Sequence, residues 1–273
     1  MNKETKHPAD IYGEVVLSFL LGSLRLWRAA AAAHRLNCAL CSFHVTGENV
    51  IQGHPYQNTL NHLAKIPRSS YDSLQYITNV SHLVYATTLL DTFLTDTTLF
   101  LFLSFPQSIG TNYQVSLSTL LASSSRSEVL TVTAIKKARE ISYLPFLGRI
   151  DYLRKTFGLD ISMPSSVSDA LEHYPSIRNT VLHDQGVFEI TLADDGSIQS
   201  RQKTSPHRPT QVNTTDVETA ANSYEKVVLT IARAIIIQVL KAPNHPVLES
   251  LLKARIGQHD SIDNESAGDA NSP

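Results

Sequence analysis

The chain has 273 residues, of which 42% are hydrophobic and 18% charged, and this balance excludes the charge-rich, apolar-poor type of chain that stays disordered. Its length favours one large domain or two small ones. A formal net charge of −2 at pH 7 excludes a broad basic excess, so any polyanion must be bound by a local patch. Two cysteines exclude a disulfide framework, and the first ten residues lack the apolar core of a signal peptide. We therefore expect a soluble protein of the cytoplasm.

Two apolar stretches, at 15–33 and 83–105, need to be tested as membrane spans. The first contains two arginines, Arg25 and Arg28, and the second contains Asp91 and Asp96. Each such charge costs about 2.5 to 3.5 kcal/mol at the centre of a bilayer. We therefore expect both stretches to be helices of a soluble protein, and we expect no membrane partner.

The first part of the chain predicts two long helices joined by a loop. Apolar residues recur every three or four positions from residue 11 to about 43, and the alanines near the middle of this stretch have high helix propensity. Residues 45–70 contain two glycines and two prolines without a sustained period, which indicates a loop. A second helix is expected from about 73 to 104, where it stops before Pro106.

Three further helices and a hairpin are predicted in the rest of the chain. Serines around 123–127 interrupt the pattern, and a helix then follows from about 128 to 157, kinked or split by Pro145 and ended by Gly158. Either Ser166 or Ser168 is a suitable cap for the next helix, which runs to about His183.

Gly186 stands where a helix-ending glycine is expected. Residues 187–203 alternate in polarity around Asp195 and Gly196, a pattern typical of a short β-hairpin. The last helix is expected from about 215 to 241.

Together these elements predict an all-α protein, an antiparallel helical bundle with a short β-hairpin insertion before the last helix. We expect a single domain over residues 1–257. Its parts are an N-terminal helix and loop at 1–70, a bundle core at 71–242 and the hairpin insertion at about 187–203. The acidic tail 258–273, rich in serine and asparagine, is expected to be disordered.

The segment at the end of the fourth expected helix has the strongest chemical signal in the sequence. It places Arg178 and Asn179 shortly before His183, which is followed by Asp184, Gln185 and Gly186. On an ideal helix Asn179 and His183 share a face, whereas Arg178 and His183 lie about 140° apart. Two copies of the helix related by a two-fold axis would bring both arginines and both histidines into one cleft. The negative end of the helix dipole also favours a protonated His183, by up to about 1 to 2 kcal/mol.

This segment resembles the signature of the HEPN superfamily, in which an arginine and a polar residue precede a histidine by a short, fixed spacing. The glycine and hairpin that follow are similar to a bacterial subgroup related to the ribonuclease and abortive-infection branches. The resemblance covers about 70–240 and is strongest at 174–186. It extends more weakly to the second long helix, through Tyr76, His82, Leu83, Leu90, Asp91, Phe93 and Leu94.

The resemblance implies a metal-independent endoribonuclease that works as a homodimer and needs no cofactor. In such an enzyme the ribose 2′-hydroxyl attacks the adjacent phosphate. By position, His183 would be the general acid or base, Arg178 would bind phosphate and stabilise developing charge, and Asn179 would orient groups in the cleft. The biological setting it implies is a bacterial defence or toxin system, with an antitoxin or regulatory partner.

Other residues are expected to support this site. Asp91 or Asp96, within an apolar stripe, is a candidate ion-pair partner for Arg178, and Asp184 directly follows His183. Basic residues gather at 136–139 and 149–155. A further cluster, on and after the hairpin, is the one expected to guide an RNA backbone: Arg201, Lys203 and Arg208, with His207.

The sequence leaves alternatives open. Arg178 and His183 can instead cap backbone carbonyls in the last turn of a surface helix, and the basic cluster can be a solvated loop. A helical module without catalysis, which holds RNA, nucleotide or a protein partner in its cleft, fits the same pattern. Four further residues are of zinc-binding type, but a straight helix spreads them over about 15 Å, too far for one ion. They are His34, Cys38, Cys41 and His44. We favour ordinary helix positions for these residues and expect no metal site. The alternatives are that two of them bind a metal together with ligands from elsewhere, or that Cys38 and Cys41 are redox active.

Overall fold

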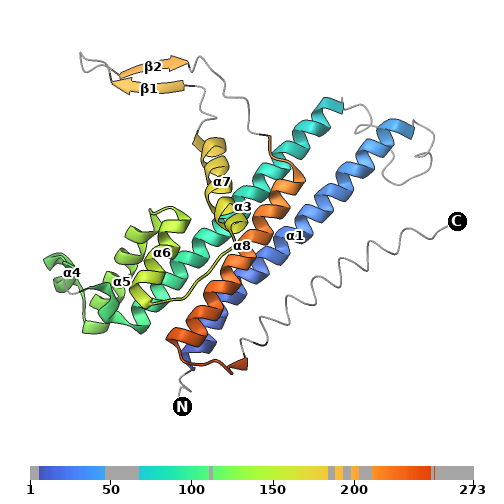
Figure 1. The fold of residues 1–273 in the computed structure, drawn as a ribbon. Coiled ribbons are helices and arrows are strands. Elements are labelled where there is room, and N and C mark those ends of the chain that lie inside the picture. The colour runs from blue at the N-terminus through green and yellow to red at the C-terminus, as the bar shows by residue number, and fades with distance from the viewer. Residues whose placement is uncertain are drawn as a thin grey trace. The chain divides into compact units, whose positions relative to one another are not determined.

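The computed structural model describes residues 6–46, 68–110, 113–183, 188–192, 198–202, 211–246 and 249 (Figure 1). It is an all-α helical bundle, which confirms the fold class predicted from the helical periodicity. The helices are α1 (Pro8–Thr46), α3 (Arg68–Ser104), α4 (Leu117–Ala122), α5 (Arg126–Ser142), α6 (Phe146–Phe157), α7 (Ser165–His183) and α8 (Thr214–Ala234). A 3-10 helix, η2 (Pro106–Ile109), follows α3, and a π-helix, η3 (Ile235–Val239), continues α8.

The region before α8 contains two strands, β1 (Phe188–Leu192) and β2 (Ile198–Gln202). They pair antiparallel, with Phe188 opposite Gln202 and Leu192 opposite Ile198. The turn predicted around Asp195 and Gly196 lies outside the described residues.

The expected third helix is split in two by Pro145. Because a proline has no backbone N–H to donate, α5 ends at Ser142 and Pro145 becomes the residue that precedes α6. The short helix α4, which the sequence pattern does not predict, lies between η2 and α5. Elsewhere the main difference is that α3 begins at Arg68, five residues before its predicted start at 73.

Local side-chain contacts fix where several helices begin. Ser125 Oγ accepts a hydrogen bond from the backbone N–H of Glu128 at 3.2 Å, so a serine from the interrupting run caps α5. Before α8, the side chains of Asn213 and Asp216 accept hydrogen bonds from each other's backbone N–H groups, both at 2.9 Å. This reciprocal pairing satisfies donors that the first turn of a helix leaves open.

The described chain divides into two compact units, whose boundaries fall within α1, α3 and α8. The first unit contains the described residues within the ranges Met1–Leu20, Asp91–Pro164 and Glu225–Pro273. In it the ring of Tyr12 lies 5.0 Å from that of Phe100, and the ring of Phe19 lies 5.9 Å from that of Phe93. Later residues of α1 thus meet earlier residues of α3, so these two helices run antiparallel.

A second set of contacts in the first unit joins α3 to α5 and α6. The buried residues are Phe102, Ala134, Ala138 and Ile141, with Leu99, Ile109, Tyr152 and Phe157 packed against them. The end of α3 is therefore covered by the two helices that follow it in the chain.

The second unit contains the described residues within the ranges Leu21–Leu90 and Ser165–Tyr224. Here α1 and α3 approach closely at Gly22, where an added Cβ would lie 2.6 Å from Leu89 Cδ2. Asn79 donates to the carbonyl of Val212 at 3.1 Å, and the hydroxyls of Thr87 and Tyr224 lie 3.3 Å apart. Along α3 these contacts follow the same order as along the chain that leads into and through α8, so the two helices run parallel, whereas the sequence predicts an antiparallel bundle. The chain returns through α4 to α7 before it enters α8.

Two segments, Pro8–Leu36 and Leu74–Ser104, are long and apolar enough to cross a membrane by length and composition alone. This is weak evidence, because the core helix of a soluble protein passes the same test. In the second segment 56% of the apolar window is buried within the protein.

Several sequence predictions fall on residues that the structure does not describe. Most of the loop predicted at 45–70, the helix-ending Gly186 and the tail 258–273 lie outside the described residues. The prediction of a single domain over 1–257 stays a prediction.

Candidate functional site

Helix α7 carries Arg178 and Asn179 in its last two turns. Its buried residues recur at helical spacing and pack the helix into the second unit: Val167, Ala170, Leu171, Tyr174, Ile177 and Val181. Arg178 is partly buried and Asn179 is exposed. The two functional candidates therefore flank the packed face, and the helix around them is held by its core contacts.

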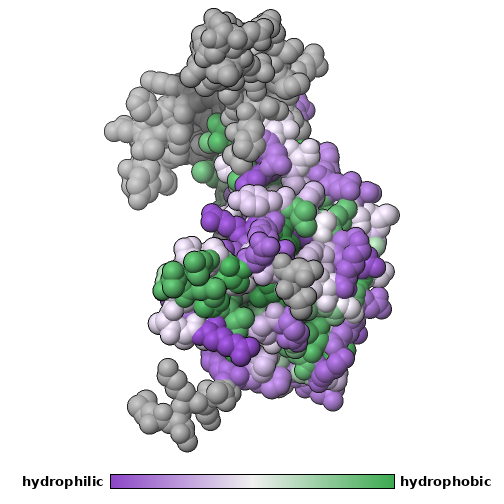
Figure 2. Space-filling view, turned by 90° about the vertical axis from the view of Figure 1, so that its left-hand side faces the viewer, coloured by the Kyte–Doolittle hydropathy of each residue, from purple (hydrophilic) through white to green (hydrophobic). Residues whose placement is uncertain are grey.

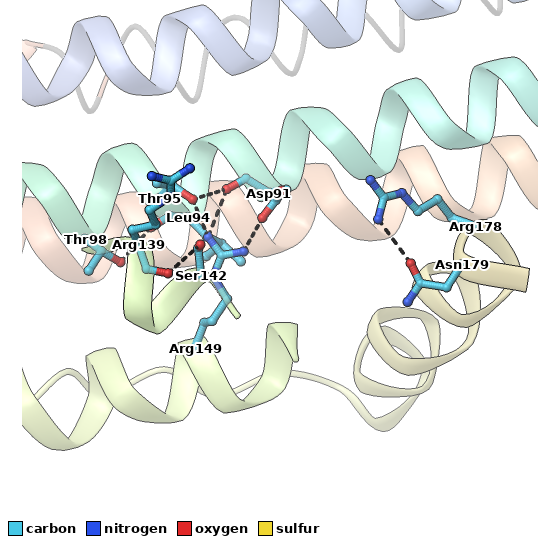
Figure 3. Close-up of polar contacts among 9 residues, drawn as sticks. All are labelled: Asp91, Leu94, Thr95, Thr98, Arg139, Ser142, Arg149, Arg178 and Asn179. Atoms are coloured by element: carbon cyan, nitrogen blue, oxygen red, sulfur yellow. Dashed lines mark hydrogen bonds and ion pairs between the residues drawn. The ribbon is translucent and has the colours of Figure 1, made fainter. Parts of the chain in front are cut away.

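The guanidinium of Arg178 contacts its neighbour in the chain. Nη1 of Arg178 donates to Oδ1 of Asn179 at 3.1 Å (Figure 3). Nε of Arg178 is buried and has no hydrogen-bond partner in the described part of the chain. A guanidinium is always charged and has five N–H donors in a planar fork. Arg178 is thus a charged group oriented by an amide, with one buried donor left unsatisfied.

Tyr174, one helical turn before Arg178, belongs to the surroundings of this arginine. Burial raises the pKa of its hydroxyl, while a hydrogen bond with Thr219 acts in the opposite direction and the charge of Asp216 raises the pKa further. The second half of α7 therefore faces the first turns of α8, where an acidic side chain is present. Tyr174 has no distinguishing signal in the sequence, because a tyrosine on an apolar helix face is an ordinary core residue.

The predicted acid or base, His183, is the last residue of α7. Its side chain and the whole of Asp184 lie outside the described residues, as do the side chain of Arg201 and the whole of Lys203 and Arg208. The structure places the backbone of Arg201 in β2. The predicted cooperation of His183 with Arg178 and the predicted RNA path stay predictions.

Asp91 forms its ion pair with Arg149 rather than with Arg178. Nη1 of Arg149 contacts Oδ1 of Asp91, and Nη2 donates to the backbone carbonyl of Asp91 at 3.0 Å and to Oγ1 of Thr95 at 2.7 Å (Figure 3). Arg149 is only 1% exposed. The physical reason is its place on α6, where Arg149 lies one helical turn from buried Leu153 and from partly buried Phe146. Its guanidinium also lies 5.7 Å from the centre of the Phe146 ring.

This contact corrects two sequence-based interpretations. The sequence groups Arg149 with Arg154 and Lys155 as a cluster of basic residues, but Arg149 is a buried ion-pair partner of Asp91. Asp91 is only partly buried and Asp96 is exposed, so the apolar stripe around them does not enclose either carboxylate. Even so, removal of water by neighbouring atoms raises the pKa of Asp96.

Two residues of α3 quoted for the family resemblance lie in partly covered positions. The hydroxyl of Tyr76 is buried and has no hydrogen-bond partner within the described residues, and burial lowers the pKa of His82. Neither feature assigns a catalytic role.

The zinc-type residues of α1 are described only in part. The side chain of His34 is exposed, whereas those of Cys38, Cys41 and His44 lie outside the described residues. Within the described ranges, no group of three or more histidine, cysteine or acidic side chains is arranged to hold a metal ion.

No family model, curated protein or solved structure matches this chain. The resemblance to the HEPN superfamily therefore stays a prediction made from the sequence.

Proposed function

We propose that the protein is a metal-independent endoribonuclease of the HEPN type. The observation that supports it is the state of Arg178: this permanent cation lies near the end of α7, is oriented by Asn179, and has a buried Nε without a protein partner among the described residues. A buried donor without a partner costs free energy, and an RNA phosphate supplies acceptor oxygens for such a donor.

The proposed reaction is an internal transesterification. The ribose 2′-oxygen forms a bond to the adjacent phosphorus while the bond from phosphorus to the 5′-oxygen of the next nucleotide breaks. A general base removes the proton from the 2′-hydroxyl, and a general acid donates a proton to the leaving 5′-oxygen. The products are a 2′,3′-cyclic phosphate and a free 5′-hydroxyl. The nucleophile is already part of the substrate, so correct orientation replaces external activation.

Arg178 and His183 divide this work in the proposal. The guanidinium of Arg178 stabilises the charge that accumulates on the phosphate oxygens in the transition state, and Asn179 holds it in place. His183 transfers the protons, because an imidazole changes charge near neutral pH. Two proton transfers need two groups, and a homodimer supplies one His183 from each copy.

The setting of this activity is part of the same proposal. The enzyme acts in the cytoplasm as a component of a bacterial defence or toxin system, where an antitoxin or regulatory partner restrains it. Arg201, Lys203 and Arg208 guide the RNA backbone toward the cleft through contacts with phosphates.

RNA cleavage by matched variants in excess chelator tests the proposal. We expect His183→Ala to lower the cleavage rate by about 10² to 10⁴-fold, the usual contribution of general acid–base catalysis. For Arg178→Ala we expect a loss of about 10² to 10³-fold. The controls are His173→Ala, an exposed histidine on the same helix, and Arg154→Ala, an exposed arginine of α6. Both should cleave within about twofold of the parent protein.

The outcomes separate the two classes of function. If the parent protein cleaves no RNA but binds it, and Arg178→Ala weakens binding, the protein is a non-catalytic module and the proposal is wrong. If sedimentation shows that the parent protein is a monomer, the proposed cleft shared by two copies does not exist and the proposal is wrong. Equal losses in the test and control variants would show a general effect on folding instead of catalysis.

A further inference from the structure

Helix α4 exposes three leucines on one face. Of its six residues, Leu117 is 69% exposed, Leu120 is 48% exposed and Leu121 is 78% exposed. Residues spaced by three and four lie on the same side of a helix, so these side chains form one apolar surface. Single exposed leucines are common on soluble proteins. Three exposed leucines on one helix of six residues form a continuous apolar surface, which that general tendency does not explain.

The opposite side of α4 is bound to the protein. Thr119 lies about 200° around the helix from Leu117 and Leu121. Nζ of Lys136, on α5, donates to Oγ1 of Thr119 at 3.1 Å. The leucine face is therefore directed away from α5. Figure 2, which views the side of the molecule where α4 lies in Figure 1, shows a hydrophobic area bordered by hydrophilic residues.

The neighbouring helix supplies positive charge. Helix α5 has four basic residues, Arg126, Lys136, Lys137 and Arg139, and two acidic ones, Glu128 and Glu140.

Both carboxylates already have donors. Glu128 accepts two hydrogen bonds from Ser124, at 2.7 and 2.8 Å, and Glu140 accepts from Tyr113 and Lys137. Lys136, which lies beside α4, bonds to a neutral hydroxyl, so this contact leaves its charge uncompensated.

The size and chemistry of this surface favour a lipid bilayer over other occupants. A stable contact between two protein copies buries about 800 Å² on each partner, but a helix of six residues is only about 9 Å long. RNA offers phosphates and bases, not an apolar phase for three leucines. A bilayer requires no complementary shape, accepts leucines at its interface and has anionic headgroups that attract lysine.

We propose that α4 is a membrane-surface contact that inserts Leu117, Leu120 and Leu121 into the interface of a bilayer containing anionic lipid. Lys136 lies near the headgroups and strengthens the contact. The proposal departs from the sequence-based expectation of no membrane partner, which was based on two apolar stretches tested as spanning segments; the contact proposed here is peripheral. It goes beyond RNA cleavage and does not depend on it.

Sedimentation of the full chain with vesicles tests the proposal. One set of vesicles contains phosphatidylcholine alone, and the other contains phosphatidylcholine with phosphatidylserine. We expect binding to the anionic vesicles that weakens at high salt, because screening reduces attraction between charges. The double variant Leu117→Ser with Leu121→Ser should bind at least tenfold more weakly, and Lys136→Gln should weaken binding to the anionic vesicles.

Matched controls are available elsewhere in the chain. Leu36 is 57% exposed and Ile77 is 59% exposed, so the double variant Leu36→Ser with Ile77→Ser removes similar apolar surface. Lys226→Gln removes an exposed cation from α8. Both controls should bind vesicles like the parent protein.

Three results would overturn the proposal. The first is no sedimentation with either type of vesicle. The second is an equal loss of binding in the α4 variant and its control. The third is a lower molecular mass in solution, without vesicles, for the α4 variant than for the parent protein, with no such change in the control variant. That result would show that the leucine face is a contact between copies of the chain. RNA cleavage by the α4 variant should be unchanged, so failure here is distinguishable from failure of the proposed nuclease activity.

Discussion

The side chain of Arg149 shows how one buried charge joins helices that are far apart in the sequence. Its guanidinium contacts Asp91 and Thr95 of α3, while its own helix, α6, packs on the same core. Taking a charge out of water is costly unless paired groups and hydrogen bonds compensate. Arg149 Nε still has no hydrogen-bond partner among the described residues, so the contact with Asp91 carries much of that compensation.

Asp91→Ala should therefore lower the free energy of unfolding by about 1 to 3 kcal/mol, because it leaves a buried guanidinium without its counter-ion. Asp151→Ala is the matched control. Asp91 and Asp151 are 48% and 49% exposed, but Asp151 pairs with Arg154 and Lys155 at the surface. The control should cost less than about 1 kcal/mol. Urea denaturation measures both, and a larger loss for Asp151→Ala would contradict the assigned role of Arg149.

Arg178 differs from Arg149 in its partner. Arg149 is neutralised by a carboxylate, whereas the described partner of Arg178 is the neutral amide of Asn179. A carboxylate partner is typical of a structural arginine, whereas the neutral partner of Arg178 is compatible with the proposed phosphate contact. The burial and pairing of both arginines depend on tertiary contacts, so these features could not be predicted from the sequence alone.

At the scale of elements, two glycines of the α6 region have different roles. The helix does not need the first one, Gly148, but it needs the second one, Gly158, in order to end where it does. Gly148 lies inside the helix, and a Cβ there would meet Leu144 Cβ at an ordinary 3.5 Å. Gly158 ends the helix with a left-handed backbone, at φ 65° and ψ 31°, and its N–H donates to the carbonyl of Arg154. A side chain is strained in that conformation.

Substitution by alanine should have opposite effects at these two positions. Gly148→Ala should raise the free energy of unfolding by about 0.5 to 1 kcal/mol, through helix propensity and a less free unfolded chain. Gly158→Ala should lower it by about 1 to 2 kcal/mol. Thermal denaturation with the same buffer for both variants checks the signs. A Gly158→Ala variant as stable as the parent protein would contradict the left-handed end of α6.

The long helices could be predicted because their apolar residues recur over many turns. The buried residues follow that recurrence, as Phe19 and Leu26 do in α1 and Phe93 and Leu101 do in α3. Helix α4 is too short for such a signal, so it was missed. The pairing of Asp91 with Arg149 was also missed, because it depends on how α6 approaches α3 and not on local spacing.

At the scale of the whole chain, the direction of α8 depends on the long connection between α3 and α8, which contains α4 to α7. An up-and-down bundle with short connections alternates helix directions, but this longer connection lets α8 run parallel to α3, as the contacts in the second unit show. Of the candidate site, Arg178 and Asn179 lie on α7 as expected. The meeting of two copies of His183 requires a second chain, which one sequence cannot specify.

The most direct test of the proposed nuclease compares an RNA strand with the same strand carrying 2′-deoxy sugars, in excess chelator, with the products analysed by mass spectrometry. We predict that only the RNA is cleaved and that the fragments end in 2′,3′-cyclic phosphate and 5′-hydroxyl groups. Equal cleavage of both strands, or cleavage that stops when the chelator is added, would contradict an attack by the ribose 2′-hydroxyl without a metal ion.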